Sequence, residues 1–153
     1  MQISRTDILA VILVLIVYSV NVVYSAAQAS WYESLVKPPL TPPGWVFGVA
    51  WQTIYILLVI ALARAFRVLH TYHTLEIALW VCNGISNMIW SFLFFSMHMV
   101  WLSLFDTSII LLTTWLLIWY MWHHDRVCSI LLVPYGLWMI WAVYLNVYIA
   151  ALN

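Results

Sequence analysis

The stretch WYESLVKPPLTPPGWVFGVAW, residues 31–51, separates two long apolar runs and both begins and ends with tryptophan. It holds four of the five prolines of the chain, Pro38, Pro39, Pro42 and Pro43. Proline fixes φ and removes a backbone donor, so two Pro-Pro pairs make a stiff, extended connector. We therefore predict a non-helical loop over residues 28–44. Its aromatic and basic side chains suit a lid, so we expect a site beneath it.

The composition is that of a protein which lies mostly within a lipid bilayer. Of the 153 residues, 67% are hydrophobic and only 7% are charged, and the mean hydropathy is +1.02. Soluble domains carry far more charge than this. The formal net charge is zero, which gives no indication of a nucleic-acid partner. The two cysteines, Cys82 and Cys128, suit buried apolar positions better than a disulfide framework.

Hydrophobic runs of bilayer length predict five membrane-spanning helices within one domain, residues 1–153. The expected spans are residues 8–27, 45–66, 76–97, 100–122 and 128–152. The predicted fold class is therefore an all-α integral membrane protein, a five-helix bundle with the proline-rich lid loop between its first two helices. A signal peptide is an alternative for the first run, because Ala27-Gln28-Ala29 resembles a cleavage site. The length of the run, and Asp7 ahead of it, favour a span.

The distribution of Lys and Arg predicts the orientation of the spans. Arg5, Arg64, Arg67 and Arg126 lie at one end of the predicted bundle, and only Lys37 lies at the other end. Basic residues favour the cytoplasmic side of a membrane. We therefore expect the N-terminus in the cytoplasm, and the proline-rich loop and the C-terminus outside.

One helical face of the third span carries amides and a tryptophan. Asn83, Asn87 and Trp90 stand at i, i+4 and i+7, so they share that face. Amides deep in a bilayer are costly unless they are paired or face a cavity. The pattern therefore indicates either hydrogen bonds between helices or the wall of a cavity.

Other spans supply further candidate residues. Trp51 on the second span and Trp138 on the fifth lie too deep for an interfacial aromatic belt. Asp106 is the only acid well inside a span, which makes it a functional candidate. These residues predict a mostly apolar pocket that opens toward the loop and takes a flat, aromatic ligand. The alternative is that the tryptophans only pack the bundle.

The histidines predict neither a metal site nor a haem site. His70 and His73 have a spacing compatible with a metal, but no cysteine or carboxylate partner set accompanies them. No histidine of the sequence lies at mid-depth in a predicted span, which argues against a haem held by two histidines. We therefore expect no metal and no bound cofactor.

Three segments in register resemble the TspO/MBR family of tryptophan-rich sensory proteins and translocator proteins. The first is W-Y-x-x-L-x-K-P-x-x-x-P-P-x-W-x-F-x-x-x-W, from Trp31 to Trp51. The second is N-x-x-W-S-x-L-F-F, residues 87–95. The third is P-Y-x-x-W-x-x-x-A-x-x-L-N-x-x-I-x-x-L-N, residues 134–153. The resemblance covers essentially the whole chain.

The resemblance implies a five-helix bundle, commonly a homodimer, that binds tetrapyrroles such as protoporphyrin IX. It also implies binding of benzodiazepine-type and isoquinoline carboxamide ligands, and of cholesterol in some members. The ligand-binding residues that it implies are Tyr32, Trp51, Asn83, Asn87, Trp90, Asp106, Trp138, Ala142 and Leu145. Some bacterial relatives are reported to degrade porphyrin in light. In that case Trp51 and Trp138 would be the redox-active, catalytic residues.

We expect a receptor, sensor or transporter on this basis, with a light-dependent porphyrin-degrading enzyme or a lipid-binding scaffold as alternatives. The family's sterol motif has a basic residue after a tyrosine late in the fifth helix. Here no Lys or Arg follows Arg126. Cholesterol transport is therefore not expected, and we expect the cell membrane of a bacterium as the location.

Overall fold

The computed structural model describes residues 4–68 and 74–153, and this part of the chain is helical without a strand. The loop histidines considered for a metal, His70 and His73, lie outside the described residues. The elements in order are α1 (Arg5–Ala27), α2 (Ala29–Ser34), α3 (Gly44–Val68), α4 (Thr74–Ser91), the π-helical segment η1 (Phe92–Ser96), α5 (Val100–His124) and α6 (Arg126–Leu152).

Five helices are long and apolar enough to cross a membrane: α1, α3, α4 with η1, α5 and α6, of 23 to 27 residues each. About 20 residues suffice for the hydrocarbon core of a bilayer. Each helix covers one of the five expected runs, with ends that differ by a few residues. The all-α bundle of five spanning helices is thus confirmed, and the protein is a multi-pass membrane protein.

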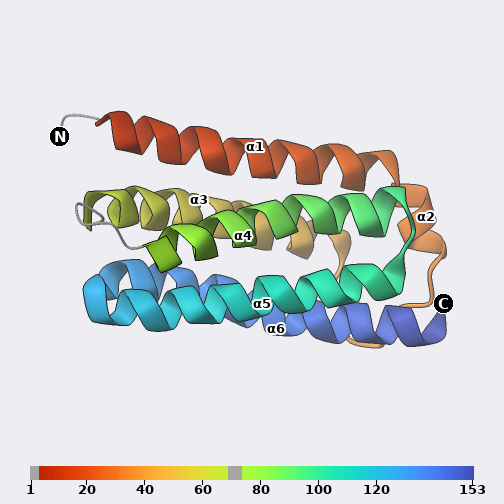
Figure 1. The fold of residues 1–153 in the computed structure, drawn as a ribbon. Helices are drawn as coiled ribbons and strands as arrows, with labels where there is room; N and C mark the ends of the chain where they lie inside the picture. Colours follow the sequence, from red (N-terminus) through yellow and green to blue (C-terminus); the bar gives the residue numbers. More distant parts are fainter. Residues whose placement is uncertain (1–3, 69–73) are drawn as a thin grey trace.

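The five long helices form a closed ring rather than a layer. Contacts between elements run α1–α3–α6–α5–α4 and back to α1. Figure 1 shows these helices lying side by side, with α2 across one end of the bundle, near the C-terminus. The chain begins at the opposite end. Helices in a ring enclose space along their common axis, and the functional site lies in that space.

Two helical segments depart from the sequence expectations. Residues 28–44 were expected to be non-helical throughout, and this is wrong because Ala29–Ser34 forms α2. The prolines begin only at Pro38, so nothing in residues 29–34 opposes a helix. At the end of the third span, η1 replaces the last α-helical turn, and the N–H of Met97 donates to the carbonyl of Phe92 at 3.0 Å. Such π-helical turns occur often at functional sites.

An ion pair and a helix cap fix the end of the bundle opposite α2. Arg64 donates to both carboxylate oxygens of Asp125, at 2.9 and 3.0 Å. Asp125 also caps α6 by accepting from the N–H groups of Val127 and Cys128. Burial alone would raise the pKa of the Asp125 carboxyl, but the hydrogen bonds from Arg64 and from the two N–H groups outweigh it and hold the pKa below its usual value.

Candidate functional site

A cavity of about 460 Å³ lies inside the ring of helices, in the half of the bundle next to α2. All five long helices and α2 contribute to its wall. Its volume falls within the usual range for small-molecule sites. The cavity therefore lies at the end of the bundle where α2 joins the proline-rich segment.

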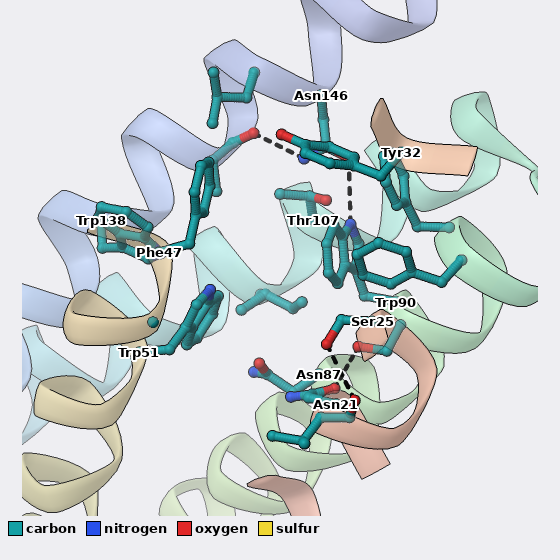
Figure 2. Close-up of a pocket in the computed structure, with 18 of the residues that line it drawn as sticks. Asn21, Ser25, Tyr32, Phe47, Trp51, Asn87, Trp90, Thr107, Trp138 and Asn146 are labelled. Carbon is teal, nitrogen blue, oxygen red and sulfur yellow. Dashed lines mark hydrogen bonds between the residues drawn. The ribbon is translucent and has the colours of Figure 1, made fainter. Parts of the chain in front are cut away.

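Aromatic rings from different helices form the two main walls of the cavity. Figure 2 shows Phe47, Trp51 and Trp138 on one side and Trp90 across from them. The Trp51 and Trp138 rings meet edge to face, with centroids 6.3 Å apart. Trp90 stacks on Phe94 at 5.1 Å, and η1 positions Phe94 in this wall. Such walls suit a flat, unsaturated ligand, because ring faces stack on it.

Polar groups lie at each end of the cavity, and at each end they form a hydrogen bond with a neighbouring side chain. At one end, the amide of Asn87 donates to the Tyr135 hydroxyl at 2.6 Å. At the other end, the Trp90 indole N–H donates to Asn146 at 3.2 Å (Figure 2). These bonds satisfy amides within the membrane-spanning helices, where unpaired polar groups are costly. They also fix the orientation of the Trp90 ring.

Seven of the nine sequence-predicted site residues line this cavity. They are Tyr32, Trp51, Asn87, Trp90, Trp138, Ala142 and Leu145. The structure therefore brings together residues that are up to 113 positions apart in the sequence (145 − 32). The shared helical faces were visible in the sequence, and the ring arrangement turns those faces inward.

The structure places Asn83 and Asp106 outside the lining of this cavity. Asn83 lies one helical turn below Asn87 and donates to Thr113 and Thr114 of α5, at 2.9 and 3.0 Å. Asp106 is 6% exposed, and its Oδ2 has no hydrogen-bond partner among the described residues. Both side chains are buried between α4 and α5, so in this geometry they support the wall rather than touch a ligand.

Several lining residues were not among the sequence-predicted site residues. Asn21 on α1 donates to the Tyr55 hydroxyl at 2.6 Å and accepts from Ser91 of α4. Asn146 and Phe47 also line the cavity. The amides of Asn21 and Asn146 inside apolar runs were the available signal, because polar side chains there must find partners. Phe47 gave no such signal.

The short helix α2 bounds the cavity at this end of the bundle. Tyr32 and Glu33 of α2 line the cavity. Burial, and then the charge of Glu33, raises the pKa of the Tyr32 phenol. Tyr32 therefore stays protonated at neutral pH and can donate a hydrogen bond to a ligand.

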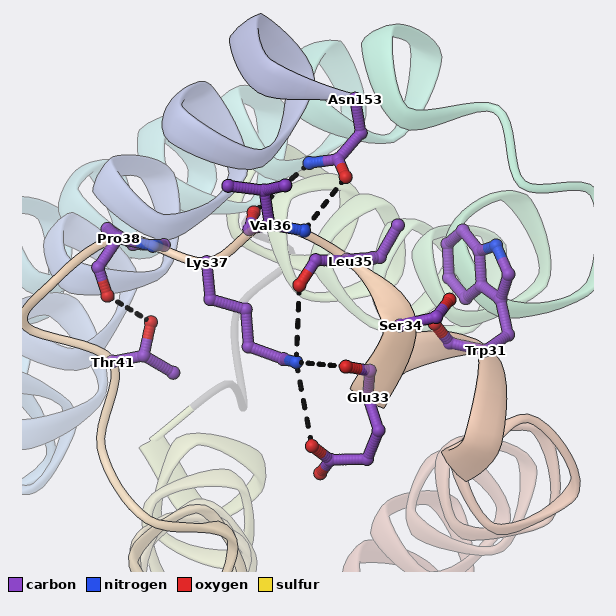
Figure 3. Close-up of polar contacts among 9 residues, drawn as sticks. All are labelled: Trp31, Glu33, Ser34, Leu35, Val36, Lys37, Pro38, Thr41 and Asn153. Atoms are coloured by element: carbon purple, nitrogen blue, oxygen red, sulfur yellow. Dashed lines mark hydrogen bonds and ion pairs between the residues drawn. The ribbon is translucent and has the colours of Figure 1, made fainter.

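The segment after α2 is fastened to the end of α6. The side-chain amide of Asn153 accepts from the N–H of Val36 at 2.9 Å and donates to its carbonyl at 3.1 Å (Figure 3). This pairing satisfies both backbone groups of Val36. It holds the start of the proline-rich segment against the end of α6.

A second, smaller cavity of about 310 Å³ lies between α1, α3 and α4. Its lining is almost entirely apolar, and it includes exposed residues such as Ile77 and Val81. Tyr55 and Asn87 line both cavities, so they form the partition between the two. Asn83 lines the second cavity.

Comparison with known proteins decides which family these features belong to. The TspO/MBR family model matches residues 8–152. The chain belongs to the TspO/MBR family. It is 36% identical over 132 residues to the tryptophan-rich protein TspO of Archaeoglobus fulgidus, which covers 81% of this chain and 80% of the relative. It is 29% identical to TspO of Bacillus cereus over the full length of both chains. The tryptophan-rich sensory protein of Cereibacter sphaeroides is 30% identical over 123 residues, 80% of this chain and 77% of the relative.

The family assignment agrees with the three segments that carried the resemblance in the sequence. In this TspO/MBR protein, residues 31–51 comprise most of α2, the proline-rich segment and the start of α3, and the two helices line the cavity. Residues 87–95 and 134–153 supply further lining residues, Trp90 and Trp138 among them. The three segments therefore meet around one space.

Proposed function

We propose that this TspO/MBR protein is a membrane receptor or carrier that binds a tetrapyrrole such as protoporphyrin IX in the 460 Å³ cavity. The observation that carries the proposal is the pair of facing aromatic walls, built from Trp51 and Trp138 on one side and Trp90 on the other. A flat macrocycle can stack between such walls. Benzodiazepine-type and isoquinoline carboxamide compounds, which are also flat and aromatic, would compete for the same space.

The proposed roles follow the positions of the lining residues. Trp51, Trp90 and Trp138 provide stacking surfaces, Tyr32 donates from the mouth, and Asn87 offers its amide at the inner end. Ala142 and Leu145 shape the wall on α6. Asn83 and Asp106 act behind the wall.

We also propose a membrane, an oligomeric state and an orientation for the protein. We place it in a bacterial cell membrane as a homodimer, with the N-terminus in the cytoplasm and the cavity mouth outside. The arginines at the end of the bundle opposite α2 support this orientation. The relative in Cereibacter sphaeroides is named a sensory protein, which supports a receptor role here.

Titration of the purified protein with protoporphyrin IX tests the proposal. Binding should shift the porphyrin absorption band and quench tryptophan fluorescence, because the indoles would contact the ring. Replacing Ala142 with Phe should weaken binding by at least about tenfold, because it fills the cavity from the α6 wall. A wild-type protein that gives neither a band shift nor quenching would overturn the tetrapyrrole assignment.

One observation favours a second function, the light-dependent breakdown of bound porphyrin. The Trp51 ring lies near three other aromatic rings, those of Tyr55 at 5.6 Å, Trp138 at 6.3 Å and Tyr135 at 6.4 Å. A chain of oxidisable rings beside a photoexcited ligand can pass electrons. Trp51→Phe and Trp138→Phe should then slow the loss of the porphyrin band in light, while binding in the dark is largely kept. Equal loss of both activities would show that the tryptophans only hold the ligand.

A further inference from the structure

The positive charges of this protein are divided unequally between the two ends of the bundle. The sequence contains five Lys and Arg residues, all within the part of the chain that the structure describes. Four are arginines at the end opposite α2. Lys37 is the remaining cation. It lies three residues after α2, next to Tyr32 and Glu33, which line the cavity. An anionic group of a ligand in the cavity therefore has one basic side chain at its own end of the protein.

The ammonium group of Lys37 is held in place by the oxygen atoms around it. It donates to the carbonyls of Glu33 and Leu35, at 2.9 and 3.4 Å, and lies 3.5 Å from the Glu33 carboxylate (Figure 3). It also lies 5.0 Å from the centre of the Tyr32 ring. Since Tyr32 and Glu33 line the cavity, the charge of Lys37 lies directly beside two residues of its wall.

The two side chains of this ion pair differ in their exposure to solvent. The Lys37 side chain is 19% exposed, whereas that of Glu33 is 78% exposed. A pair four residues apart in which the carboxylate is exposed to solvent contributes little to stability. The Glu33 carboxylate can therefore leave at low cost while Lys37 keeps its two carbonyl contacts. A carboxylate of a ligand can take the place of Glu33.

The rest of the cavity explains why an acidic ligand would need this partner. Among the described lining residues, Glu33 is the only charged side chain. Burying a carboxylate among aromatic rings without a partner is costly. A flat acid bound between the walls must therefore turn its carboxylates toward Lys37.

We propose that Lys37 is a specificity-determining residue that pairs with a carboxylate of the tetrapyrrole, and that Glu33 occupies the place of this carboxylate as a competing internal anion. This inference rests on the proposed tetrapyrrole function. The site should therefore prefer free acids over neutral esters. The macrocycle should bind in one orientation, with its propionates next to Lys37.

Comparison of protoporphyrin IX with its dimethyl ester tests the inference, because the ester keeps the macrocycle and replaces the two carboxylates with neutral methyl esters. Dissociation constants are measured in the dark by tryptophan quenching for the wild type, Lys37→Gln, Lys37→Arg and Glu33→Gln. We expect Lys37→Gln to weaken binding of the acid about tenfold and to change binding of the ester less than about twofold. Lys37→Arg should restore most of the affinity for the acid. Glu33→Gln should strengthen binding of the acid about threefold, since it removes the competitor.

The outcomes separate this inference from the proposed function. Equal weakening of acid and ester in Lys37→Gln would overturn the inference, because it would show that the lysine only holds the end of α2. Unchanged affinity for both ligands in Lys37→Gln, or for the acid in Glu33→Gln, would also overturn it. In both cases the wild type still binds porphyrin, so the proposed function stands. A wild type that binds neither form would overturn the function and the inference together.

Discussion

At the scale of single residues, Tyr135 joins two buried amides of α4. Its hydroxyl accepts from Asn87 at 2.6 Å and donates to Asn83 at 3.1 Å. The side chain is 2% exposed. Asn83 continues the network to α5 through Thr113 and Thr114. One hydroxyl thus connects α4, α5 and α6 at the inner end of the cavity.

We expect Tyr135→Phe to lower the free energy of unfolding by about 1–2 kcal/mol. The change keeps the ring and removes the partner of two buried amides. Unfolding in mixed micelles with increasing denaturing detergent measures the effect. Tyr144→Phe is the matched control, because Tyr144 is 37% exposed on the same helix, and it should change stability by less than about 0.5 kcal/mol. Equal effects of the two variants would contradict the role given to the Tyr135 hydroxyl.

At the scale of elements, the close contact of α5 and α6 depends on Gly136. A Cβ at this position would lie 3.0 Å from Ile118 and 3.2 Å from Trp115, both on α5. The two helices therefore approach each other through the missing side chain. Gly48 on α3 has nothing within 4 Å of a Cβ.

Substitution of the two glycines by alanine should change the stability of the protein in opposite directions. Gly136→Ala should destabilise the protein by about 1 kcal/mol through overpacking. Gly48→Ala should stabilise it by about 0.5 kcal/mol, because alanine favours a helix more than glycine does. Thermal unfolding of both variants under the same detergent conditions measures the difference. A stabilising Gly136→Ala would mean that Ile118 and Trp115 move aside without cost.

The link between α3 and the start of α6 should depend on pH through Asp125. Its folded-state pKa lies below the ordinary value of 3.8, so its ionised form stabilises the folded state at higher pH. This contribution is present above about pH 4 and is lost as the pH falls through the lower, folded-state pKa. Asp125→Asn keeps a capping acceptor but loses the charge paired with Arg64.

The expected cost of Asp125→Asn at pH 7 is below about 1 kcal/mol, because Arg64 is partly exposed. The difference in unfolding free energy between wild type and variant should shrink below pH 4. Measurements at pH 7, 5 and 3 would show it. A difference that grows toward low pH would contradict the assigned sign.

The helices could be predicted from the sequence because each spanning run has the length and apolar character that a bilayer demands. The spacing of Asn87 and Trp90 likewise predicted which face of the third span turns inward. Helical periodicity predicts which residues share one face of a helix. It does not predict how far along that face a cavity extends. Asn83 shares the face of Asn87, yet it bonds to Thr113 and Thr114 of α5 and does not line the first cavity.

The two short helical segments could not be predicted in the same way. The six residues of α2 are too few to show a helical period. They were therefore included in the loop predicted over residues 28–44. The widened turn η1 differs from an α-helix by one residue per turn, which leaves no pattern in five residues. Asp106 stood out as an intramembrane acid, but only the structure shows that it lies between α4 and α5 rather than in the cavity.

At the scale of the whole molecule, one side chain ties the segment between α2 and α3 to the end of α6. Asn153 joins the end of α6 to Val36, 117 positions earlier in the sequence, through two hydrogen bonds. The segment between α2 and α3 is thereby held at the last residue of the chain described, next to the end of α6. Any movement of Val36 away from α6 must break this pairing.

We expect Asn153→Ala to loosen the proline-rich segment without unfolding the bundle. The amide of Val36 would lose its acceptor, so hydrogen exchange in residues 35–41 should become at least several-fold faster. Exchange in α5, which does not contact Asn153 in any described hydrogen bond, serves as the internal control. Unchanged exchange in residues 35–41 would show that the prolines alone hold the segment.

The position of Asn153 also decides how this protein should be handled in the laboratory. An affinity tag or fluorescent protein fused after Asn153 begins beside the cavity mouth and can disturb its pairing with Val36. The same fusion placed ahead of α1 begins at the far end of the bundle. Two preparations that differ only in the placement of a tag can therefore report different ligand affinities for one and the same pocket.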